Sequence, residues 1–184
     1  MNPLSRLLIV ATVLGLAGCN VLPEPQGDTV RYFTLSNPAS VTVPAVDGTI
    51  VRPVQLAGYL RNRAMAVRVA ENEVVYLDDV RWAESLGDAI TNLLRARLGT
   101  VGGNNIVTVQ IQRCELARFE GNGVQLTATY AILSAGEGGS PKRGVFTSGP
   151  RTWDGKNYGL LVGQLRDAVG ELSDAIAAAL SEKK

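Results

Sequence analysis

The sequence contains no histidine, and its 184 residues include only two cysteines. The lack of histidine removes the commonest general base, the commonest zinc ligand and any nucleophile pair that relies on an imidazole. No G-x-S-x-G segment is present to form the nucleophile elbow of a hydrolase. We therefore expect a non-catalytic protein, with no catalytic residue, no cofactor and no metal site.

An excess of charge of either sign is also absent. The chain carries 18 basic and 17 acidic side chains, and no basic run exceeds two residues, as in Lys183–Lys184. A protein that binds nucleic acid through its phosphates needs a basic surface. A polybasic membrane patch needs a similar cluster. The composition argues against nucleic acid as a partner and against attachment to a membrane by charge alone.

The N-terminus has the features of a secretory signal. Arg6 supplies the basic region, Leu7–Leu16 is almost wholly apolar, and two small residues precede Cys19. An apolar region of about ten residues is too short to span a bilayer permanently. The segment Leu16–Cys19 resembles a bacterial lipobox, in which a peptidase cuts before a cysteine that carries a diacylglycerol. An ordinary signal peptide with an unmodified Cys19 is the alternative.

Lipidation of Cys19 would decide where the mature protein resides. The freed amine of such a cysteine is usually acylated as well, and two or more acyl chains attach a protein stably to a membrane. In lipoproteins of this type, Asp after the cysteine tends to retain the protein in the inner membrane, whereas this chain has Asn20. We predict a lipid-anchored protein of the outer membrane that faces the periplasm.

Removal of residues 1–18 from the 184-residue chain leaves 166, which is enough for one domain with a substantial core. It also removes Arg6, so the mature chain would carry 17 charges of each sign. Residues 19–29 contain Pro23 and Pro25 and are predicted to form an extended, lipidated tether. Residues 30–184 are predicted to form a single domain.

Short strands are predicted in the first half of this domain. They are Val30–Leu35, Thr49–Leu56, and a hairpin of Ala64–Val69 with Glu73–Leu77; Asn37–Gly48 is expected to be a loop. Pro53 within the second strand predicts an edge or a bulge, because proline cannot donate to the sheet.

A helix is predicted from about Arg81 to Leu98, since apolar residues recur there at three- and four-residue spacing. Asp78 or Asp79 is expected to cap its start, and Gly99 its end. The adjacent carboxylates could also indicate an acid/base pair or a metal site. Capping is the better explanation because no further ligand cluster lies nearby.

A long antiparallel ribbon is predicted from Ile106–Phe119 and Val124–Leu133, joined by a Gly-Asn-Gly turn. The apolar alternation of the first strand changes parity after Ile111, so we expect a β-bulge near Arg113. Cys114 lies in this strand and is predicted to be a small core residue; a reactive or intermolecular thiol is the alternative. With Cys19 lipidated, an intrachain disulfide is excluded.

The C-terminal part is predicted to contain a loop, a short strand and a long helix. Gly136–Gly144 is glycine-rich, but it lacks the spacing of a phosphate-binding loop, and Pro141 removes a backbone donor. Val145–Ser148 is predicted to be a last strand. Tyr158–Leu180 has an amphipathic helical pattern, which most often packs on the domain's own sheet; a partner helix or a lipid is the alternative target. The fold class is thus α+β, a mostly antiparallel sheet with a long β-ribbon and two amphipathic helices on one face.

Several segments together resemble the ABC-type transport auxiliary lipoproteins, the PqiC-like group. The resemblance covers most of the mature chain and is carried by these segments in order: Tyr32-Phe33-x-Leu35, Val51–Arg68 with Tyr59-Leu60, Arg81-Trp82-Ala83-Glu84-x-Leu86, the ribbon around Phe119 and Leu126, and Tyr158–Leu180. Ser85 stands where the family often has proline, an exchange that a first helical turn tolerates.

The resemblance implies an accessory role in lipid transport between membranes. Such lipoproteins look like outer-membrane partners of a periplasmic MCE-domain protein, whose permease and ATPase lie in the inner membrane. Members of the family are thought to form homo-oligomeric rings at the tip of the MCE tunnel. Apolar or polar-neutral surface on the sheet and helix ends is expected to receive the partner.

Two other functions stay open at this stage. One is a structural or assembly lipoprotein of the cell envelope that is unrelated to lipid transport. The other is a hydrolase, which the presence of serines and carboxylates allows but the lack of histidine disfavours.

Overall fold

The computed structural model describes residues 27, 29–36, 48–99, 101, 104–119, 121–134 and 140–182. The predicted signal, Cys19, most of the tether and nearly all of the loop Asn37–Gly48 lie outside these residues. In chain order, the elements are β1 (Arg31–Phe33), β2 (Ile50–Val51), β3 (Gln55–Leu56), the 3-10 helix η2 (Gly58–Arg61), β4 (Ala64–Ala70), β5 (Glu73–Trp82), α2 (Leu86–Leu98), β6 (Ile106–Ala117), β7 (Gly123–Leu133), β8 (Lys142–Thr147), β9 (Arg151–Thr152) and α3 (Tyr158–Ser181).

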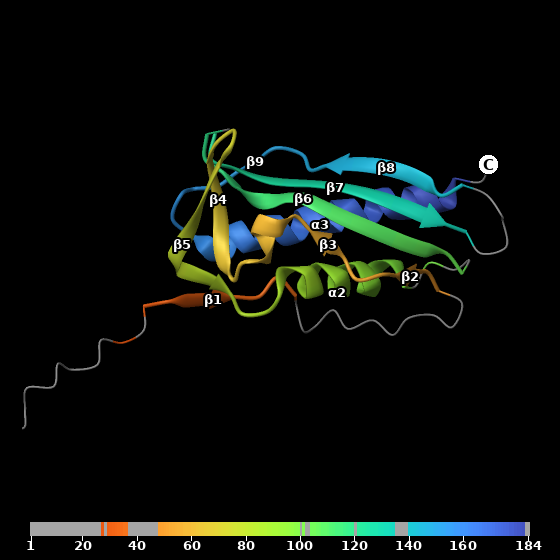
Figure 1. Ribbon diagram of the computed structural model, residues 1–184, viewed down its shortest axis with the longest axis horizontal. Helices are drawn as coiled ribbons and strands as arrows, with labels where there is room; N and C mark the ends of the chain where they lie inside the picture. The colour runs from red at the N-terminus through yellow and green to blue at the C-terminus, as the bar shows by residue number, and fades with distance from the viewer. Residues whose placement is uncertain are drawn as a thin grey trace, which may run out of the picture.

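Nine strands of the described chain form one open sheet, in the order β1-β5-β4-β6-β7-β8 (Figure 1). The short strands β2 and β3 pair with β6, and β9 pairs with β7. The longest pairings, β4 with β5, β6 with β7 and β7 with β8, are antiparallel, as is β9 with β7. The shorter pairings of β1 with β5, and of β2, β3 and β4 with β6, are parallel. The predicted α+β class with a mostly antiparallel sheet is confirmed.

The ribbon of β6 and β7 is the centre of this sheet. Its turn contains Gly121 and Asn122, both with positive φ (84° and 58°), a conformation that glycine and asparagine adopt at low cost. The pairing register shifts between Ile111 and Arg113, so Gln112 is the extra residue of a β-bulge. The predicted ribbon and bulge are therefore confirmed, although β6 ends at Ala117 rather than Phe119.

Pro53 divides the predicted strand Thr49–Leu56 into two. The residues on either side form β2 and β3, and both strands pair with the same edge of β6. Proline offers no N–H to the neighbouring strand, so pairing stops there and resumes at Gln55. The result is a kinked edge segment whose outward side chains, such as Arg52, project from the rim of the sheet.

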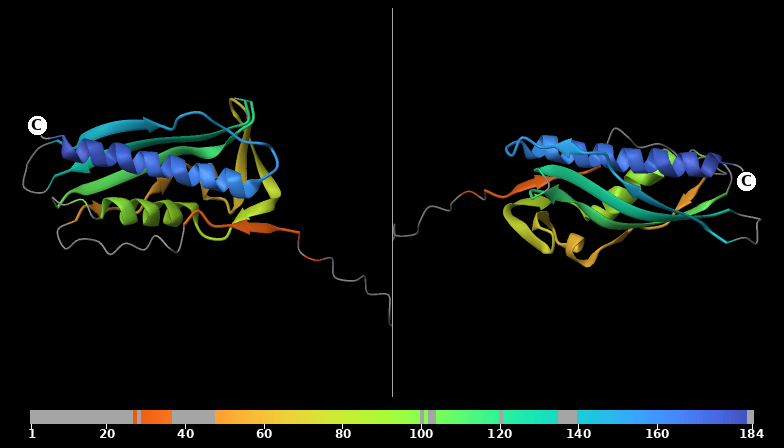
Figure 2. Two further views of the ribbon diagram at one scale, coloured as in Figure 1. Left: turned by 180° about the vertical axis from the view of Figure 1, so that it is seen from behind. Right: turned by 90° about the horizontal axis from the view of Figure 1, so that it is seen from above.

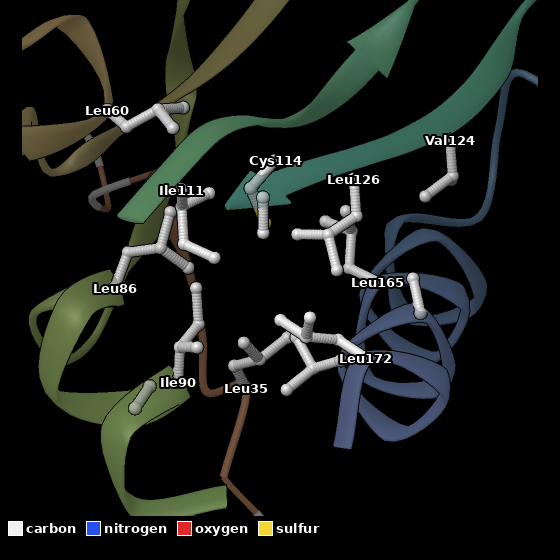
Figure 3. Close-up of a cluster of buried hydrophobic side chains, with 14 of the residues drawn as sticks. Leu35, Leu60, Leu86, Ile90, Ile111, Cys114, Val124, Leu126, Leu165 and Leu172 are labelled. Atoms are coloured by element: carbon white, nitrogen blue, oxygen red, sulfur yellow. The ribbon is translucent and has the colours of Figure 1, made fainter. Parts of the chain in front are cut away.

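Both helices cover one face of the sheet (Figure 2). The predicted stripe of α3 is confirmed, since Leu161, Leu165, Leu172 and Ile176 are all buried. They pack with the inward side chains of the ribbon and with Leu86 and Ile90 of α2 into one core (Figure 3). Neither α2 nor α3 covers the opposite face of β6 and β7.

The predicted start of α2 is wrong. Arg81 and Trp82 belong to β5, which pairs with β1 and places Trp82 beside Phe33; the helix begins only at Leu86. Its N-cap is Ser85, whose Oγ accepts a hydrogen bond from the N–H of Asp88 at 3.4 Å, so neither Asp78 nor Asp79 caps it. The alternation of exposed Arg81 with buried Val80 and Trp82 continues the strand period, and tertiary pairing with β1 outweighs the helical spacing.

Two further strand predictions need correction. The first strand is shorter than predicted, Arg31–Phe33, and the strand predicted at Val145–Ser148 begins at Lys142, within the segment expected to be loop. The structure also contains β9, which the sequence pattern did not indicate. Two residues are too few for a periodic signal, and β9 exists because its pairing partner at Gly123–Val124 lies beside it.

Candidate interaction face

The one site residue predicted from the sequence, Cys19, lies outside the described residues, so its lipidation stays a prediction. Asp78 and Asp79 are exposed on β5, and the carboxylate of Asp79 pairs with Arg31 at 2.8 Å. No group of three or more carboxylate and thiol side chains within the described ranges is placed to hold a metal ion.

Cys114 is a buried core residue, as predicted. Its side chain lies between the ribbon and the helices, among Ile111 and Leu126 (Figure 3). Burial, with a smaller contribution from the nearby charge of Glu115, raises the pKa of the thiol to about 12. The thiol is thus protonated at neutral pH, and a protonated thiol is a poor nucleophile and metal ligand.

The uncovered face of the sheet contains a groove of about 760 Å³, which we call the open-face groove. The outward side chains of β6 and β7 form its floor, and residues of the β2–β3 segment and of β8 form its walls. Its principal lining residues are Arg52, Gln55, Thr108, Ala131, Arg143 and Val145.

The pairing registers explain why this surface is hollow. Thr108 lies opposite Ala131, and Ala131 lies opposite Arg143, so one row across the sheet has small side chains at its centre and a long one at its edge. Arg52 follows β2 at the other edge, where its N–H donates to the carbonyl of Val107 at 2.9 Å. Directly opposed residues in a sheet share a face, so the two arginines flank a shallow floor.

The groove is positively charged. No carboxylate is among its described lining residues. Within the described part of the chain, neither Arg52 nor Arg143 forms a hydrogen bond or an ion pair through its side chain. Both side chains are exposed, so both guanidinium groups are available to an anionic ligand.

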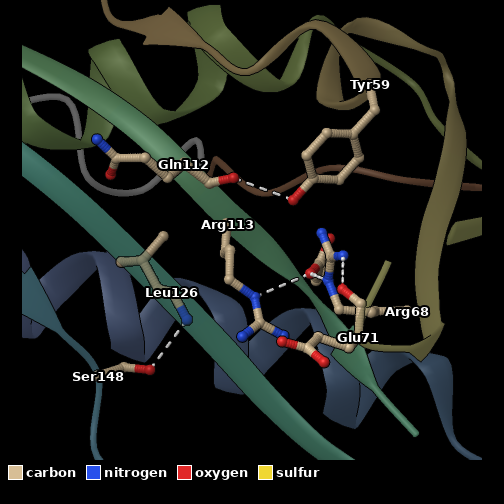
Figure 4. A network of polar contacts seen from close by, with 8 residues as sticks. Tyr59, Arg68, Glu71, Gln112, Arg113, Leu126 and Ser148 are labelled. Atoms are coloured by element: carbon tan, nitrogen blue, oxygen red, sulfur yellow. Dashed lines mark hydrogen bonds and ion pairs between the residues drawn. The ribbon is translucent and has the colours of Figure 1, made fainter. Parts of the chain in front are cut away.

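Beyond the bulge, the same face of β6 is covered rather than open. There Glu115 is buried, and its Oε1 accepts hydrogen bonds from Nε of Arg68 at 2.5 Å and from Nε of Arg113 at 3.1 Å. The guanidinium of Arg68 lies 5.4 Å from the ring centroid of Tyr59, whose hydroxyl donates to the carbonyl of Gln112 (Figure 4). We call Tyr59, Arg68, Arg113 and Glu115 the Glu115 cluster.

The electrostatics of the Glu115 cluster indicate a structural role. Burial and the neighbouring carboxylate of Glu115 raise the pKa of Tyr59, so its hydroxyl stays protonated. Burial alone would lower the pKa of Arg68, but the hydrogen bonds and charge of Glu115 and Tyr59 raise it overall. The cluster therefore attaches β4 and η2 to β6 through fixed charges, and neither group is a proton donor or acceptor suited to neutral pH.

A family comparison identifies the chain. The family model described as the ABC-type transport auxiliary lipoprotein component matches residues 33–177. The chain belongs to this family. Membership gives it an auxiliary role in an ABC-type transport system and a membrane-associated location. Of the helices in the described ranges, neither α2 nor α3 is long and apolar enough to cross a bilayer.

Two solved structures are similar to this family member in fold. One, titled as the crystal structure of an uncharacterized protein, has a TM-score of 0.64 and 16% identity, and the match covers 82% of this chain and 97% of that one. The other is protein XCC0632 from Xanthomonas campestris, of the DUF330 family, with a TM-score of 0.59, 16% identity and coverage of 80% and 88%. No curated protein matches the sequence significantly.

The open-face groove was not predicted from the sequence in any detail. The only sequence signal for its floor is the position of Thr108, Gln110 and Thr129, polar residues that alternate with the apolar residues of the ribbon and therefore face away from the core. The walls had no such signal, because Arg52 and Arg143 are 91 positions apart and become neighbours of the floor only through strand pairing.

Proposed function

We propose that this protein is a non-catalytic outer-membrane lipoprotein that serves an ABC/MCE-type system for lipid transport between membranes and supports outer-membrane integrity. The family match over residues 33–177, which is nearly the whole folded domain, carries this proposal. The energy for transport would come from the ATPase of the inner-membrane complex. A nucleotide site in this chain is then unnecessary.

The anchor in this proposal is Cys19. The small residues before it and the asparagine after it favour cleavage, acylation and delivery to the outer membrane. The folded domain begins close to this point, since β1 starts at Arg31. The tether between them is about ten residues long and contains two prolines, so it would hold the domain near the membrane surface while allowing it to reorient.

The periplasmic partner is an MCE-domain protein. The folded domain of this chain binds that partner, and it does so as a homo-oligomeric ring. Exposed apolar side chains support the presence of contact surfaces. Phe119 follows β6 at the end of the sheet where the β4–β5 hairpin and the β6–β7 turn lie together (Figure 1), and it is 44% exposed; Tyr76 of β5 is 39% exposed. Aromatic side chains of this kind are enriched in protein interfaces.

Photo-crosslinking in cells tests this function. The full chain would carry a benzophenone amino acid in place of Phe119, and the captured proteins would be identified by mass spectrometry. We expect the MCE-domain protein and further copies of this chain. Capture of envelope-assembly proteins without any MCE-domain protein would instead support an assembly lipoprotein and would overturn the transport role.

The anchor is tested with a matched pair of cysteine variants. Cys19→Ala removes the acylation site and should release the protein from the outer-membrane fraction. Cys114→Ala changes only a core thiol and should leave the protein in the outer-membrane fraction. Mass spectrometry of the native protein should find residue 19 as the acylated N-terminus. An intact, unmodified N-terminus in native membranes would contradict the proposal.

A further inference from the structure

The open-face groove continues into a row of apolar side chains. Ile50 pairs with Ile106, and Ile106 pairs with Leu133, so the three side chains lie in one row across β2, β6 and β7. Ile50 is 56% exposed and Leu133 is 43% exposed. The next row along the same face is that of Arg52, Thr108, Ala131 and Arg143. An apolar row therefore adjoins a cationic one.

The spacing of the cationic row suits one anionic group. Arg52 and Arg143 are separated by three strand spacings of about 4.8 Å each, or about 14 Å between their backbones. The side chains between them, Thr108 and Ala131, are small. Two long arginine side chains can therefore converge on an anion above this floor, and guanidinium groups match phosphate oxygens in geometry.

We propose that the open-face groove binds one anionic phospholipid, with its phosphate between Arg52 and Arg143 and an acyl chain along Ile50, Ile106 and Leu133. This inference rests on the proposed transport function and names the substrate class and site that would serve it. The groove volume of about 760 Å³ lies in the ordinary range for small-ligand sites.

An acidic peptide fits this surface less well than a lipid. An extended peptide gains most of its affinity by adding a strand to a free sheet edge. The floor of the groove is formed by β6 and β7, and both strands already have neighbours along each edge: β6 pairs with β2, β3 and β7, and β7 pairs with β6 and β8. A lipid needs no backbone partner, and it uses the cationic and apolar rows together.

Photo-crosslinking from Leu133 tests the inference in the full-length protein in cells. A benzophenone amino acid at position 133 would lie beside the acyl chain, and mass spectrometry of the purified protein would report a phospholipid adduct. The control places the same residue at Leu160 of α3, which is 46% exposed and lies on the helical layer. We expect a phospholipid adduct at position 133 at several times the level at position 160.

The role of the arginines is tested in the same background. Arg52→Gln with Arg143→Gln should lower the adduct at position 133 by at least about fivefold, because two charge-assisted contacts to the phosphate are lost. Arg61→Gln with Arg118→Gln removes the same charge from exposed positions outside the groove lining and should leave the adduct unchanged. Equal loss in both variants would show a general charge effect and overturn the site.

These outcomes separate the inference from the function on which it rests. Capture of the MCE-domain protein from position 119 with no phospholipid adduct at position 133 would overturn the lipid site and leave the transport role standing. A peptide adduct at position 133 in place of lipid would also overturn it, and would assign the groove to a protein partner. An adduct that depends on Arg52 and Arg143 supports the proposal.

Discussion

Arg68 of β4 donates a hydrogen bond from its Nε to Oε1 of Glu115 in β6, at 2.5 Å, across strands 47 positions apart in sequence. Arg113, which follows the bulge, donates to the same oxygen. A single buried carboxylate thus holds two guanidinium groups from different strands. The bulge makes this possible, because the register shift at Gln112 changes which residues of β6 face outward.

Replacing Glu115 should destabilise the domain strongly. Glu115→Gln removes the buried carboxylate charge to which Arg68 and Arg113 both donate, and the side chains of these arginines are only 15% and 23% exposed. We expect a loss of about 2–4 kcal/mol in the free energy of unfolding, measured by urea titration with circular dichroism. The exposed pair Arg97–Asp174 provides the control, since Asp174→Asn should cost less than about 0.5 kcal/mol. Equal costs would contradict a buried ion pair.

Cys114 should resist alkylation as long as the domain is folded. The rise of its pKa from 9.0 to about 12 lowers the thiolate fraction at pH 8 by about a thousandfold, and burial blocks access as well. Iodoacetamide at pH 8 should therefore label the peptide containing residue 114 in urea but not in buffer, as read by peptide mass spectrometry. Above pH 9 the unfolded chain loses the thiol proton while the folded chain keeps it, because the pKa is raised only in the folded state. The free energy of unfolding should therefore decrease as the pH rises above 9. Rapid labelling of the native protein would contradict the burial.

Gly144 should be sensitive to an added methyl group because of Tyr130. A Cβ at position 144 would overlap the tyrosine ring, with Cε1 at 2.7 Å. Gly144→Ala is expected to cost about 1–2 kcal/mol of unfolding free energy, measured by urea titration. In a Tyr130→Ala background the cost should fall by about 1 kcal/mol, since the clash is gone. Gly149 has open space at its Cβ position, so Gly149→Ala should be close to neutral.

Stability should fall at acid pH partly through Asp154. Its Oδ1 accepts hydrogen bonds from the N–H groups of Asn157 and Lys156, both at 2.9 Å, and these lower its pKa from 3.8 in the folded state. The folded state therefore binds fewer protons than the unfolded state near pH 4. The stabilisation is present above about pH 4 and is lost as the pH falls through the folded pKa.

Asp154→Asn tests this dependence. The variant should flatten the decrease in urea midpoint between pH 5 and pH 2 relative to the parent chain, because residue 154 no longer takes up a proton. It should also preserve the turn before α3, since an asparagine oxygen can accept the same backbone hydrogen bonds. An unchanged slope over this pH range would contradict the assigned pKa direction.

The success of the sequence predictions follows from how local each signal is. The α3 stripe and the alternation along β6 and β7 involve residues a few positions apart, and burial in the structure agrees with both. The bulge was visible as a change of parity within one strand. These patterns reflect which side of an element is apolar, and a chain must bury that side whatever its topology.

The sequence predictions that were wrong have a different origin. The start of α2 was placed at Arg81 because the spacing of Trp82 and Leu86 suits a helix, yet pairing of β5 with β1 extends the strand through Trp82. In the same way, β9 depends on its neighbour β7 rather than on its own residues. The spacing of apolar residues within one segment carries no information about a pairing strand that lies many positions away in the sequence.

The sequence alone determined the α+β class, the amphipathic faces of the ribbon and of α3, and the expectation of a lipid anchor at Cys19, because each depends on residues close together in the chain. Only the tertiary structure decided that Arg52 and Arg143 flank one groove and that Glu115 is buried between two arginines. Those relationships arise from strand order and register, which are set by the packing of the whole sheet against its helices rather than by any one segment.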